Sequence, residues 1–371
     1  MTVRVIGLMS GTSLDGVEGV VLDVEGTRFE LMAHASIPMP NALAAEFLAL
    51  TQPSSHELHR SALAANALMR LYADVVGRLL ASAHLSAHDI LAIGAHGQTV
   101  RHQPQYHDGT GYTLQLANPA LLAELTDMNV VADFRSRDVA AGGQGAPLAP
   151  VFHQYAFGRA GYTTAVLNVG GMANISVIGP RLTDDLLGFD CGPGNVLMDA
   201  WCAQHLGQSF DRQGEWAATG QVQADLLHAL LAEPFFALPP PKSTGRDLFH
   251  ALWLAKHLDR CGHLAAHDVQ ATLAELTAIA CTDCVSRYAY DSKILIVCGG
   301  GALNQHLMCR LQALLPGVVV QTSTAHGLAA MHVEAAAFAW LALQTMQRKA
   351  LPLQRITGSR GNRILGAIYP A

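Results

Sequence analysis

The sequence is poor in charged residues, and above all in basic ones. Only 14% of its 371 residues are charged, with 23 Lys and Arg against 29 Asp and Glu, so the formal net charge is −6. Binding a nucleic-acid backbone calls for a basic excess that this chain lacks, and we therefore expect no nucleic-acid partner. The hydrophobic fraction of 50% excludes a chain that is disordered throughout.

Long hydrophobic runs are also missing. The longest, such as Ala335 to Leu343, fall short of the roughly 18 residues that a membrane-spanning helix needs, so we expect no membrane partner. The first residues show neither the apolar segment nor the cleavage site of a signal peptide, and we expect a cytoplasmic protein. The seven cysteines are odd in number and scattered, a pattern that favours reduced thiols.

Two common nucleotide-binding motifs are absent. The sequence contains neither G-x-x-x-x-G-K-[ST] nor G-x-G-x-x-G after its first predicted strand. Three glycine-containing turns do follow predicted strands, at Gly11 to Gly16, Gly170 and Gly171, and Gly299 to Gly301. Glycine lets backbone N–H groups approach a phosphate closely, so the three turns together predict a nucleotide-binding cleft. Each turn alone is equally typical of any α/β protein.

Strands and helices alternate along the chain, which predicts an α/β fold. Buried strands are expected at 3–7, 90–99 with a polar, glycine-containing tip, 129–132, 163–168 and 294–297. Helices are expected at 41–83, 196–206, 269–288 and 333–347. At about 150 residues per domain, the length predicts two domains.

The chain shows signs of an internal duplication. Residues 163–178 repeat the opening arrangement of strand, polar glycine turn and strand, after a glycine-rich loop at 140–147. The alternative is that two unrelated hairpins with glycine turns look alike. We place the boundary in this loop, with domains at 1–145 and 146–371, and allow the last helix to pack on the first domain.

Asp190 is the first candidate for catalysis. We interpret Gly188 to Gly194 as a turn whose small residues leave the Asp190 carboxylate beside open space. There it could accept a proton from an attacking hydroxyl or water, although an Asp that bonds only its own turn remains the alternative.

Other charged residues follow strands or begin helices. Asp15, Asp133 and Glu334 could hold Mg²⁺ through water, and Arg135 or Arg137 could bind an anionic group of a substrate. Capping and surface roles are the alternatives. The residues alone do not identify a metal ligand.

The motifs resemble those of a known family, the anhydro-N-acetylmuramic acid kinases of the actin, sugar-kinase and heat-shock ATPase superfamily. The resemblance runs along nearly the whole chain and is carried by residues 7–17, 94–99, 133–135, 168–174, 188–190, 192–195, 241–246, 298–302, 334–335 and 365–370. It implies two ribonuclease-H-like domains, as in actin-like ATPases and sugar kinases, with a nucleotide cleft between them.

The resemblance also implies a reaction. ATP and water would convert 1,6-anhydro-N-acetylmuramic acid into N-acetylmuramic acid 6-phosphate and ADP, in the recycling of peptidoglycan sugars. Asp190 would deprotonate the water that attacks the anomeric carbon, and the released O6 would take the γ-phosphoryl group with Mg²⁺ present. The partners would be ATP and the sugar; whether the chain forms a homodimer stays open.

Binding residues carried over from the family fall into two groups. ATP would be bound by the first phosphate loop, the second phosphate loop and the residues bordering the adenosine, which are Gly11, Thr12, Ser13, Leu14, Asp15, Gly16, Val17 and Glu18, then Asn168, Gly170 and Gly171, then Gly299, Gly300 and Gly301. The sugar would be bound by Gln98, Arg135, Asn174 and Glu334.

Three residues depart from the family pattern: Glu18 stands where Asp is usual, Cys191 where Thr is usual, and Asp247 where Glu is frequent. Two other functions stay open. One is a plain sugar-hydroxyl kinase on the same fold, and the other is a nucleotide-gated binding module like actin or a chaperone ATPase.

Overall fold

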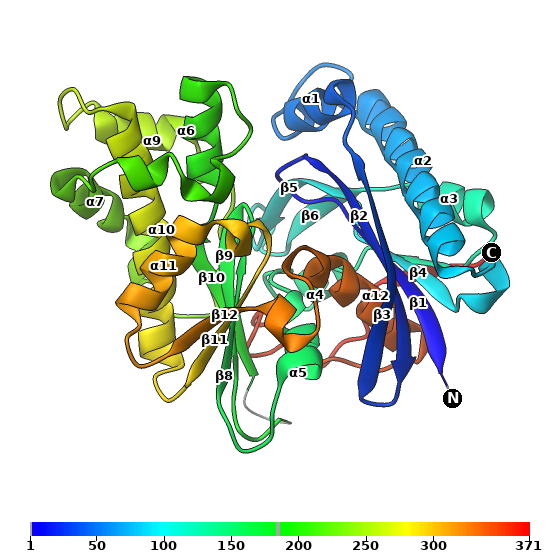
Figure 1. The fold of residues 1–371 in the computed structure, drawn as a ribbon. Coiled ribbons are helices and arrows are strands. Elements are labelled where there is room, and N and C mark those ends of the chain that lie inside the picture. Colours follow the sequence, from blue (N-terminus) through cyan, green and yellow to red (C-terminus); the bar gives the residue numbers. More distant parts are fainter. Residues whose placement is uncertain (1, 183–185) are drawn as a thin grey trace. The chain divides into compact units, whose positions relative to one another are not determined.

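The computed structural model describes residues 2–182 and 186–371 of the chain. The chain separates into two compact units, which we call the first unit (Met1–Ala156 with His332–Ala371) and the second unit (Phe157–Met331). Both combine a mixed sheet with helices, as the predicted α/β class requires (Figure 1).

The first unit is built on a six-stranded sheet in the order β13-β7-β4-β1-β2-β3. Strands β1, β4 and β7 are parallel, whereas β2 runs antiparallel to both β1 and β3. A two-stranded hairpin, β5 with β6, extends from the end of β4. The strands are β1 Val3–Met9, β2 Gly16–Glu25, β3 Arg28–Pro38, β4 Ala92–Ala95, β5 Gln98–Pro104, β6 Gly111–Leu116, β7 Val130–Ala132 and β13 Ala367–Tyr369.

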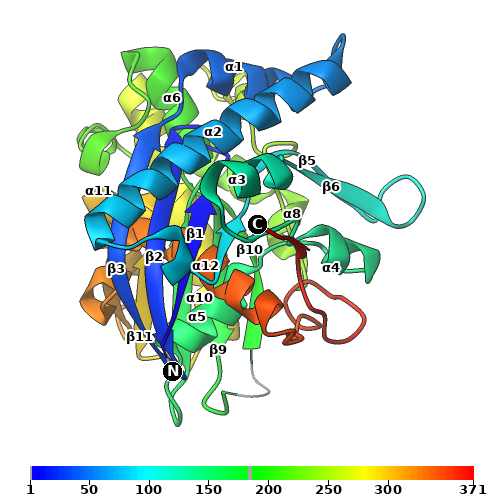
Figure 2. The ribbon, with the colours of Figure 1, turned by 90° about the vertical axis from the view of Figure 1, so that its right-hand side faces the viewer.

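Helices α2 and α12 cover the sheet of the first unit. Side chains of Ile6, Leu8 and Ile93 share one apolar cluster with Leu68 and Val75 of α2, and Figure 2 shows α2 running diagonally across the strands. Because the side chains of neighbouring strand residues point to opposite faces of the sheet, the alternate positions, such as Gly7 and Gly94, face the other helix, α12. The helices are α1 Asn41–Leu50, α2 Glu57–Ala83, α3 Pro119–Thr126, α4 Ser136–Ala140, α5 Ala149–Phe157 and α12 Val333–Met346.

The second unit carries a five-stranded sheet in the order β10-β9-β8-β11-β12. Its strands β8, β11 and β12 are parallel, and β9 is antiparallel to both β8 and β10. One apolar cluster joins this sheet to α10 and α11, and another lies among α6, α7, α9 and α10. The elements are β8 Thr164–Val169, β9 Met172–Ile178, β10 Leu186–Pro193, β11 Ile294–Cys298, β12 Val319–Thr322, α6 Val196–Leu206, α7 Ala224–Leu231, α8 Pro234–Ala237, α9 Ala251–Leu258, α10 Ala266–Tyr288 and α11 Gln305–Leu314.

The two sheets share one topology. The order β3-β2-β1-β4-β7 in the first unit corresponds strand for strand to β10-β9-β8-β11-β12 in the second. In both, three antiparallel strands come first and two strands parallel to the first one follow. The predicted fold class, with two ribonuclease-H-like domains, is confirmed.

The boundaries of the units differ from the predicted division at 145/146. The first unit extends through α5, whose Phe152 and Tyr155 rings pack against Phe29 and Trp340. It also includes residues 332–371, so the second unit is one continuous segment inserted into the first. Within the described residues, no helix combines the length and apolarity that crossing a membrane would require.

Candidate active site

In the second unit, the predicted site residues gather at the carboxyl edge of the sheet. Asn168 and Cys298 are paired at the ends of β8 and β11, so the turns that follow these strands lie side by side. Gly170 and Gly171 lie in the first turn, and in the second Gly299 leads into a short 3₁₀ helix, Gly300–Leu303. Ligands of open α/β sheets are bound at this edge, because the loops that leave parallel strands meet there.

Three polar side chains form a row across this sheet. Asn174 on β9 is directly opposite Asn168 on β8 and directly opposite Asp190 on β10. Residues directly opposite one another in antiparallel strands project from the same face, so the two amides and the carboxylate share one face. The register therefore brings Asn168, Asn174 and Asp190 together, as the predicted site requires.

Asp190 lies in strand β10, and its prediction as a turn residue was wrong. A shift of register between Asp190 and Gly192 absorbs the small residues that suggested a turn, and Gly192 itself adopts φ 152° beside the Phe236 ring. The strand keeps Asp190 6% exposed, so its carboxylate is held by the sheet rather than by a flexible loop.

The segment 242–244 fixes Asp190 from the other side. The Asp190 N–H donates to the carbonyl of Lys242 at 3.1 Å, and the Thr244 N–H donates to Asp190 Oδ2 at 2.9 Å. The ammonium of Lys242 is buried and donates to the carbonyl oxygens of Phe235 and Phe236 at the end of α8. Burial lowers the pKa of Lys242. This segment lies within the motif at 241–246, but the sequence alone predicted no role for it.

Some glycines of these turns are not required by packing. A Cβ built on Gly170 or Gly300 would come no closer than 3.7 Å and 3.5 Å to another residue, and the same holds at 3.5 Å for Gly11 in the first unit. These are ordinary contact distances. At Gly301, by contrast, a Cβ would lie 2.4 Å from Val169 Cγ1, so packing alone requires glycine there. Backbone N–H groups at glycine turns of this kind can bind phosphate groups.

The first unit presents its predicted residues at the corresponding edge. The loop Ser10 to Asp15 follows β1, Gln98 follows β4, and Arg135 follows β7. Within the predicted phosphate loop, Ser13 Oγ donates to Asp15 Oδ1 at 2.8 Å. Gly16, Val17 and Glu18 are already part of β2.

Glu18 and Asp15 form an acidic pair at the start of β2. Burial, together with the charge of Asp15, raises the pKa of Glu18 to about 7. Two carboxyl groups that repel one another in this way are placed where a cation would relieve the repulsion. This pair includes one of the three departures from the family pattern.

Arg135 is held by a buried histidine. Its Nε and Nη2 lie 3.2 Å and 3.0 Å from His96 Nε2, and its Nη1 donates to the carbonyl of Gly145 at 2.8 Å. Burial, and then the charge of Arg135, lower the pKa of His96 to about 3. The ring is therefore neutral, with Nδ1 donating to the Gly97 carbonyl at 2.7 Å and Nε2 accepting from the guanidinium.

The Gly145 carbonyl is positioned in turn by Asp138. This buried carboxylate accepts from the Gly145 N–H and from Thr357 Oγ1, each at 2.7 Å. The sequence alone did not predict that His96 and Asp138 support Arg135, although His96 lies within the motif at 94–99.

Of two predicted sugar-binding residues, Gln98 contacts the predicted phosphate loop, whereas Glu334 lies in the first turn of α12. Gln98 is buried, and its Nε2 donates to the Gly11 carbonyl at 3.2 Å. Its Oε1 has no hydrogen-bond partner within the described part of the chain. Glu334 is half-buried in the first turn of α12.

The departure at Cys191 does not face the predicted base. Cys191 belongs to the apolar cluster that also holds Phe189, Cys281 and Cys284, on the face opposite Asp190. Burial raises the pKa of the Cys191 thiol. Asp247 is exposed beside Gly245.

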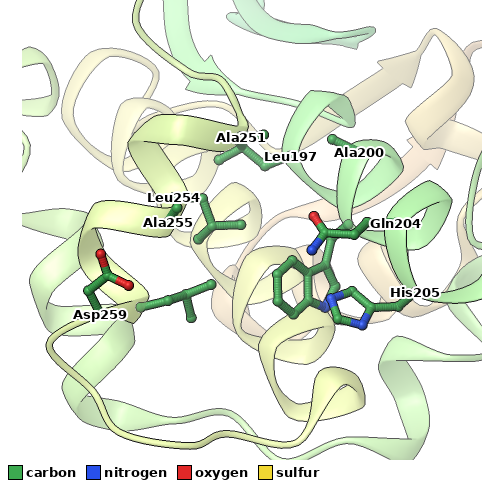
Figure 3. Close-up of a pocket in the computed structure, with 10 residues that line it drawn as sticks. Leu197, Ala200, Gln204, His205, Ala251, Leu254, Ala255 and Asp259 are labelled. Atoms are coloured by element: carbon green, nitrogen blue, oxygen red, sulfur yellow. The ribbon is translucent and has the colours of Figure 1, made fainter.

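A pocket of about 230 Å³ lies elsewhere in the second unit, between α6 and α9. Figure 3 shows Gln204 and His205 on one side of it and Asp259 on the other. Leu197, Leu254 and Leu258 make much of its lining apolar, and it contains none of the predicted site residues: its lining is Leu197, Ala200, Trp201, Gln204, His205, Ala251, Leu254, Ala255, Leu258 and Asp259.

Comparison with known proteins identifies close relatives. The family model described as anhydro-N-acetylmuramic acid kinase matches residues 3–371. Proteins named anhydro-N-acetylmuramic acid kinase from Albidiferax ferrireducens and Variovorax paradoxus are 60% and 59% identical, each over 99% of this chain and over 99% and 98% of their own length.

Solved structures are more distant. Component A of (R)-2-hydroxyglutaryl-CoA dehydratase from Acidaminococcus fermentans aligns over 91% of this chain and 96% of its own, at 12% identity and a TM-score of 0.49. The family predicted from the motifs, and with it an enzyme of the kinase class, is confirmed by the match over the full length. The chain belongs to the anhydro-N-acetylmuramic acid kinase family.

Proposed function

We propose that this enzyme uses ATP and water to convert 1,6-anhydro-N-acetylmuramic acid into N-acetylmuramic acid 6-phosphate and ADP, and that it acts in the cytoplasm, where cell-wall sugars are recycled. The observation that carries the proposal is the Asp190 carboxylate, buried in β10 at the edge that also bears the glycine turns. Family membership supplies the substrate class.

Asp190 acts as the general base. It takes a proton from water while the water oxygen bonds to the anomeric carbon and the bond from that carbon to O6 breaks. The released O6 bonds to the γ-phosphorus of ATP, and ADP leaves. Because the sheet and the Thr244 N–H hold the carboxylate, little reorganisation is needed when the proton moves.

The glycine turns bind the phosphates and border the adenosine. In the first unit, the loop after β1 and the first residues of β2 (11–18) supply one phosphate site, and in the second unit Asn168, Gly170 and Gly171 supply a second one. Gly299 to Gly301 border the adenosine. Support comes from Gly11, Gly170 and Gly300, where protein packing would admit a Cβ, so that a bound phosphate would account for the glycine.

Arg135, Gln98, Asn174 and Glu334 bind the sugar. A guanidinium fits the lactyl carboxylate of the substrate, and Arg135 is held in place by His96 and Gly145 for that task. The buried Gln98 Oε1, with no partner in the described residues, is suited to accept a hydrogen bond from a sugar hydroxyl.

Asp15 and Glu18 are the residues that would hold Mg²⁺. Their mutual repulsion and the raised pKa of Glu18 fit a cation site. The described residues contain no cluster of three His, Cys, Asp or Glu side chains for a metal, and Mg²⁺ suits this, because it keeps several waters and takes few carboxylates. When bound, Mg²⁺ neutralises charge on the phosphates.

The test is a single incubation in ¹⁸O-labelled water. Full-length protein with ATP, Mg²⁺ and 1,6-anhydro-N-acetylmuramic acid should give a phosphorylated sugar with one ¹⁸O atom at C1. A phosphorylated product without the label would favour the plain sugar-hydroxyl kinase. ATP turnover that does not respond to the sugar would favour the nucleotide-gated binding module.

A further inference from the structure

Two buried oxygen atoms, on residues paired with or bonded to Asp190, lack hydrogen-bond partners in the described part of the chain. Among residues 2–182 and 186–371, neither Asn174 Oδ1 nor Thr244 Oγ1 has a partner. A buried polar atom that stays unpaired destabilises a fold by roughly 1–3 kcal/mol, so such atoms are uncommon unless a ligand completes them. Here two of them occur on neighbours of the same aspartate.

Both atoms are placed by contacts to Asp190. Asn174 is directly opposite Asp190 in the register of β9 and β10, and its side chain shares the face of the carboxylate. The Thr244 N–H donates to Asp190 Oδ2 at 2.9 Å, so the residue that carries the hydroxyl is in direct contact with that oxygen. The register and this hydrogen bond bring Asn174, Asp190 and Thr244 together from β9, β10 and the segment 242–244.

Their chemistry matches a water molecule that is about to attack. Water offers two donor hydrogens and two lone pairs. A carboxylate and an amide oxygen accept the two hydrogens, and a hydroxyl donates to one lone pair, which leaves the other lone pair for the electrophile.

We propose that Thr244 and Asn174 position the attacking water: Asn174 Oδ1 accepts one of its hydrogens, Thr244 Oγ1 donates to its oxygen, and Asp190 accepts the hydrogen that is transferred. This rests on the proposed function, because it names the holders of the nucleophile in that reaction. In the step, the O–H bond to Asp190 forms as the water O–H bond breaks, and the water oxygen bonds to the anomeric carbon as the bond to O6 breaks.

The surrounding structure keeps Thr244 in place. The Lys242 carbonyl accepts the Asp190 N–H, and the Lys242 ammonium is anchored on the carbonyls that end α8. Thr244 is thus tied to β10 by hydrogen bonds two residues apart. A hydroxyl held in this manner loses little entropy when it binds water.

The test compares isosteric variants of the full chain. Thr244→Val removes the hydroxyl but keeps the N–H bonded to Asp190, so kcat should fall about tenfold to hundredfold while KM for ATP and the melting temperature stay unchanged. Thr244→Ser should restore most of kcat. The matched control is Thr282→Val, whose buried hydroxyl donates only within α10 to the carbonyls of Ala278 and Ile279, and its kcat should stay within about twofold.

Methanol provides a readout that is specific for the nucleophile. Methanol has one donor hydrogen and cannot satisfy both Asp190 and Asn174, so the wild type should favour water over methanol. Asn174→Ala removes the second acceptor and should raise the ratio of methyl glycoside 6-phosphate to reducing sugar 6-phosphate several-fold in mixed solvent.

The outcomes separate this proposal from the proposed function. A Thr244→Val enzyme with wild-type kcat, or an Asn174→Ala enzyme with an unchanged product ratio, overturns the water site while Asp190→Asn still tests the base. Absence of ¹⁸O from the wild-type product overturns the hydrolytic function itself. Recovery of kcat by Thr244→Ser excludes misfolding as the cause of the Val effect.

Discussion

The two units share a strand order but carry different groups at the carboxyl edges of their sheets. In the first unit these groups are mostly charged: Asp15 precedes β2, Glu18 lies near its start, and Arg135 follows β7. In the second unit a single acid, Asp190, stands among the amides Asn168 and Asn174. The shared topology thus fixes where side chains are presented, and the residues after each strand decide the chemistry.

The units also differ in how they bury ionisable groups. The first unit buries neutral histidines: burial lowers the pKa of His96 and His153 to about 3 and that of His102 to about 4. The second unit buries thiols, and burial raises the pKa of Cys191. In both units these buried groups take their uncharged forms, because burial disfavours the charged form.

Asp190→Asn should produce the largest effect on turnover. It removes the proposed proton acceptor, which lies in the second unit, and leaves the first unit unchanged. The amide keeps the shape of the carboxylate but cannot take a proton, so kcat should fall by about 10³-fold or more. ATP affinity, measured by titration calorimetry, should stay within a few-fold of the wild type. A variant with unchanged kcat would eliminate Asp190 as the base. The second unit would then not supply the catalytic carboxylate that distinguishes it from the first.

Glycines that look alike in the sequence should respond differently to alanine. At Gly94 a Cβ would lie 2.1 Å from the Phe338 carbonyl oxygen, so Gly94→Ala should destabilise the first unit by about 3 kcal/mol or more. Gly170→Ala should leave the melting temperature unchanged and weaken ATP binding about tenfold, because its Cβ enters the space we assign to phosphate. Thermal unfolding and nucleotide titration check the pair, and wild-type ATP affinity in Gly170→Ala would contradict the assigned phosphate site.

Arg135→Met tests the anion-binding role of the first unit. Loss of a charge-assisted hydrogen bond should raise KM for the sugar about 10- to 100-fold, with KM for ATP unchanged. Arg137→Met, on the exposed side of α4, is the control and should leave both constants near wild type. Steady-state kinetics with each substrate varied in turn measures this, and a larger effect in the control would move the role to Arg137.

Glu18→Gln should have the smallest effect on stability, and this effect is measured without Mg²⁺ or ATP because Glu18 is also assigned to the Mg²⁺ site. The pKa of Glu18 is raised from 4.5 to about 7 in the folded chain, so its contribution to stability is complete below pH 4.5 and is lost as the pH rises through 7. The neutral amide avoids this loss, so the variant should be about 1 kcal/mol more stable at pH 8 after allowance for solvent screening, and equal at pH 4.

Urea unfolding at both pH values checks the Glu18 prediction. Glu25→Gln, exposed at the end of the same strand, serves as the control. A Glu18→Gln chain that is less stable than wild type at pH 8 would show that the carboxylate is satisfied in the fold rather than strained.

Elements with strong local signals could be predicted from the sequence. The helix at 196–206 has the bounds of α6, because its apolar pattern is followed by Gly207 in the left-handed region. The glycine turns were found because they interrupt apolar strands. The strand β3 was missed, since Arg28–Pro38 alternates exposed and half-buried residues and carries no strong hydrophobic signal.

The site could be predicted only in part, for a different reason. Asp190 was identified, but its strand was not, because the pairing of β10 with β9 outweighs the turn preference of the surrounding glycines. The hold of His96 on Arg135 joins residues 39 positions apart. The Thr244 N–H is a backbone group that any residue type except proline would supply, so no sequence pattern reveals it.

The insertion of residues 157–331 ahead of α12 sets an order for the folding of the nascent chain. When the ribosome has made residue 156, the strands that contain Gly7 and Gly94 have been synthesised. Helix α12, whose backbone packs closely against both glycines, has not. The inserted unit is complete in itself and emerges before that helix. We therefore expect the second unit to fold first during translation, and the first unit to wait, with one sheet face exposed to chaperones and proteases, until its closing helix arrives.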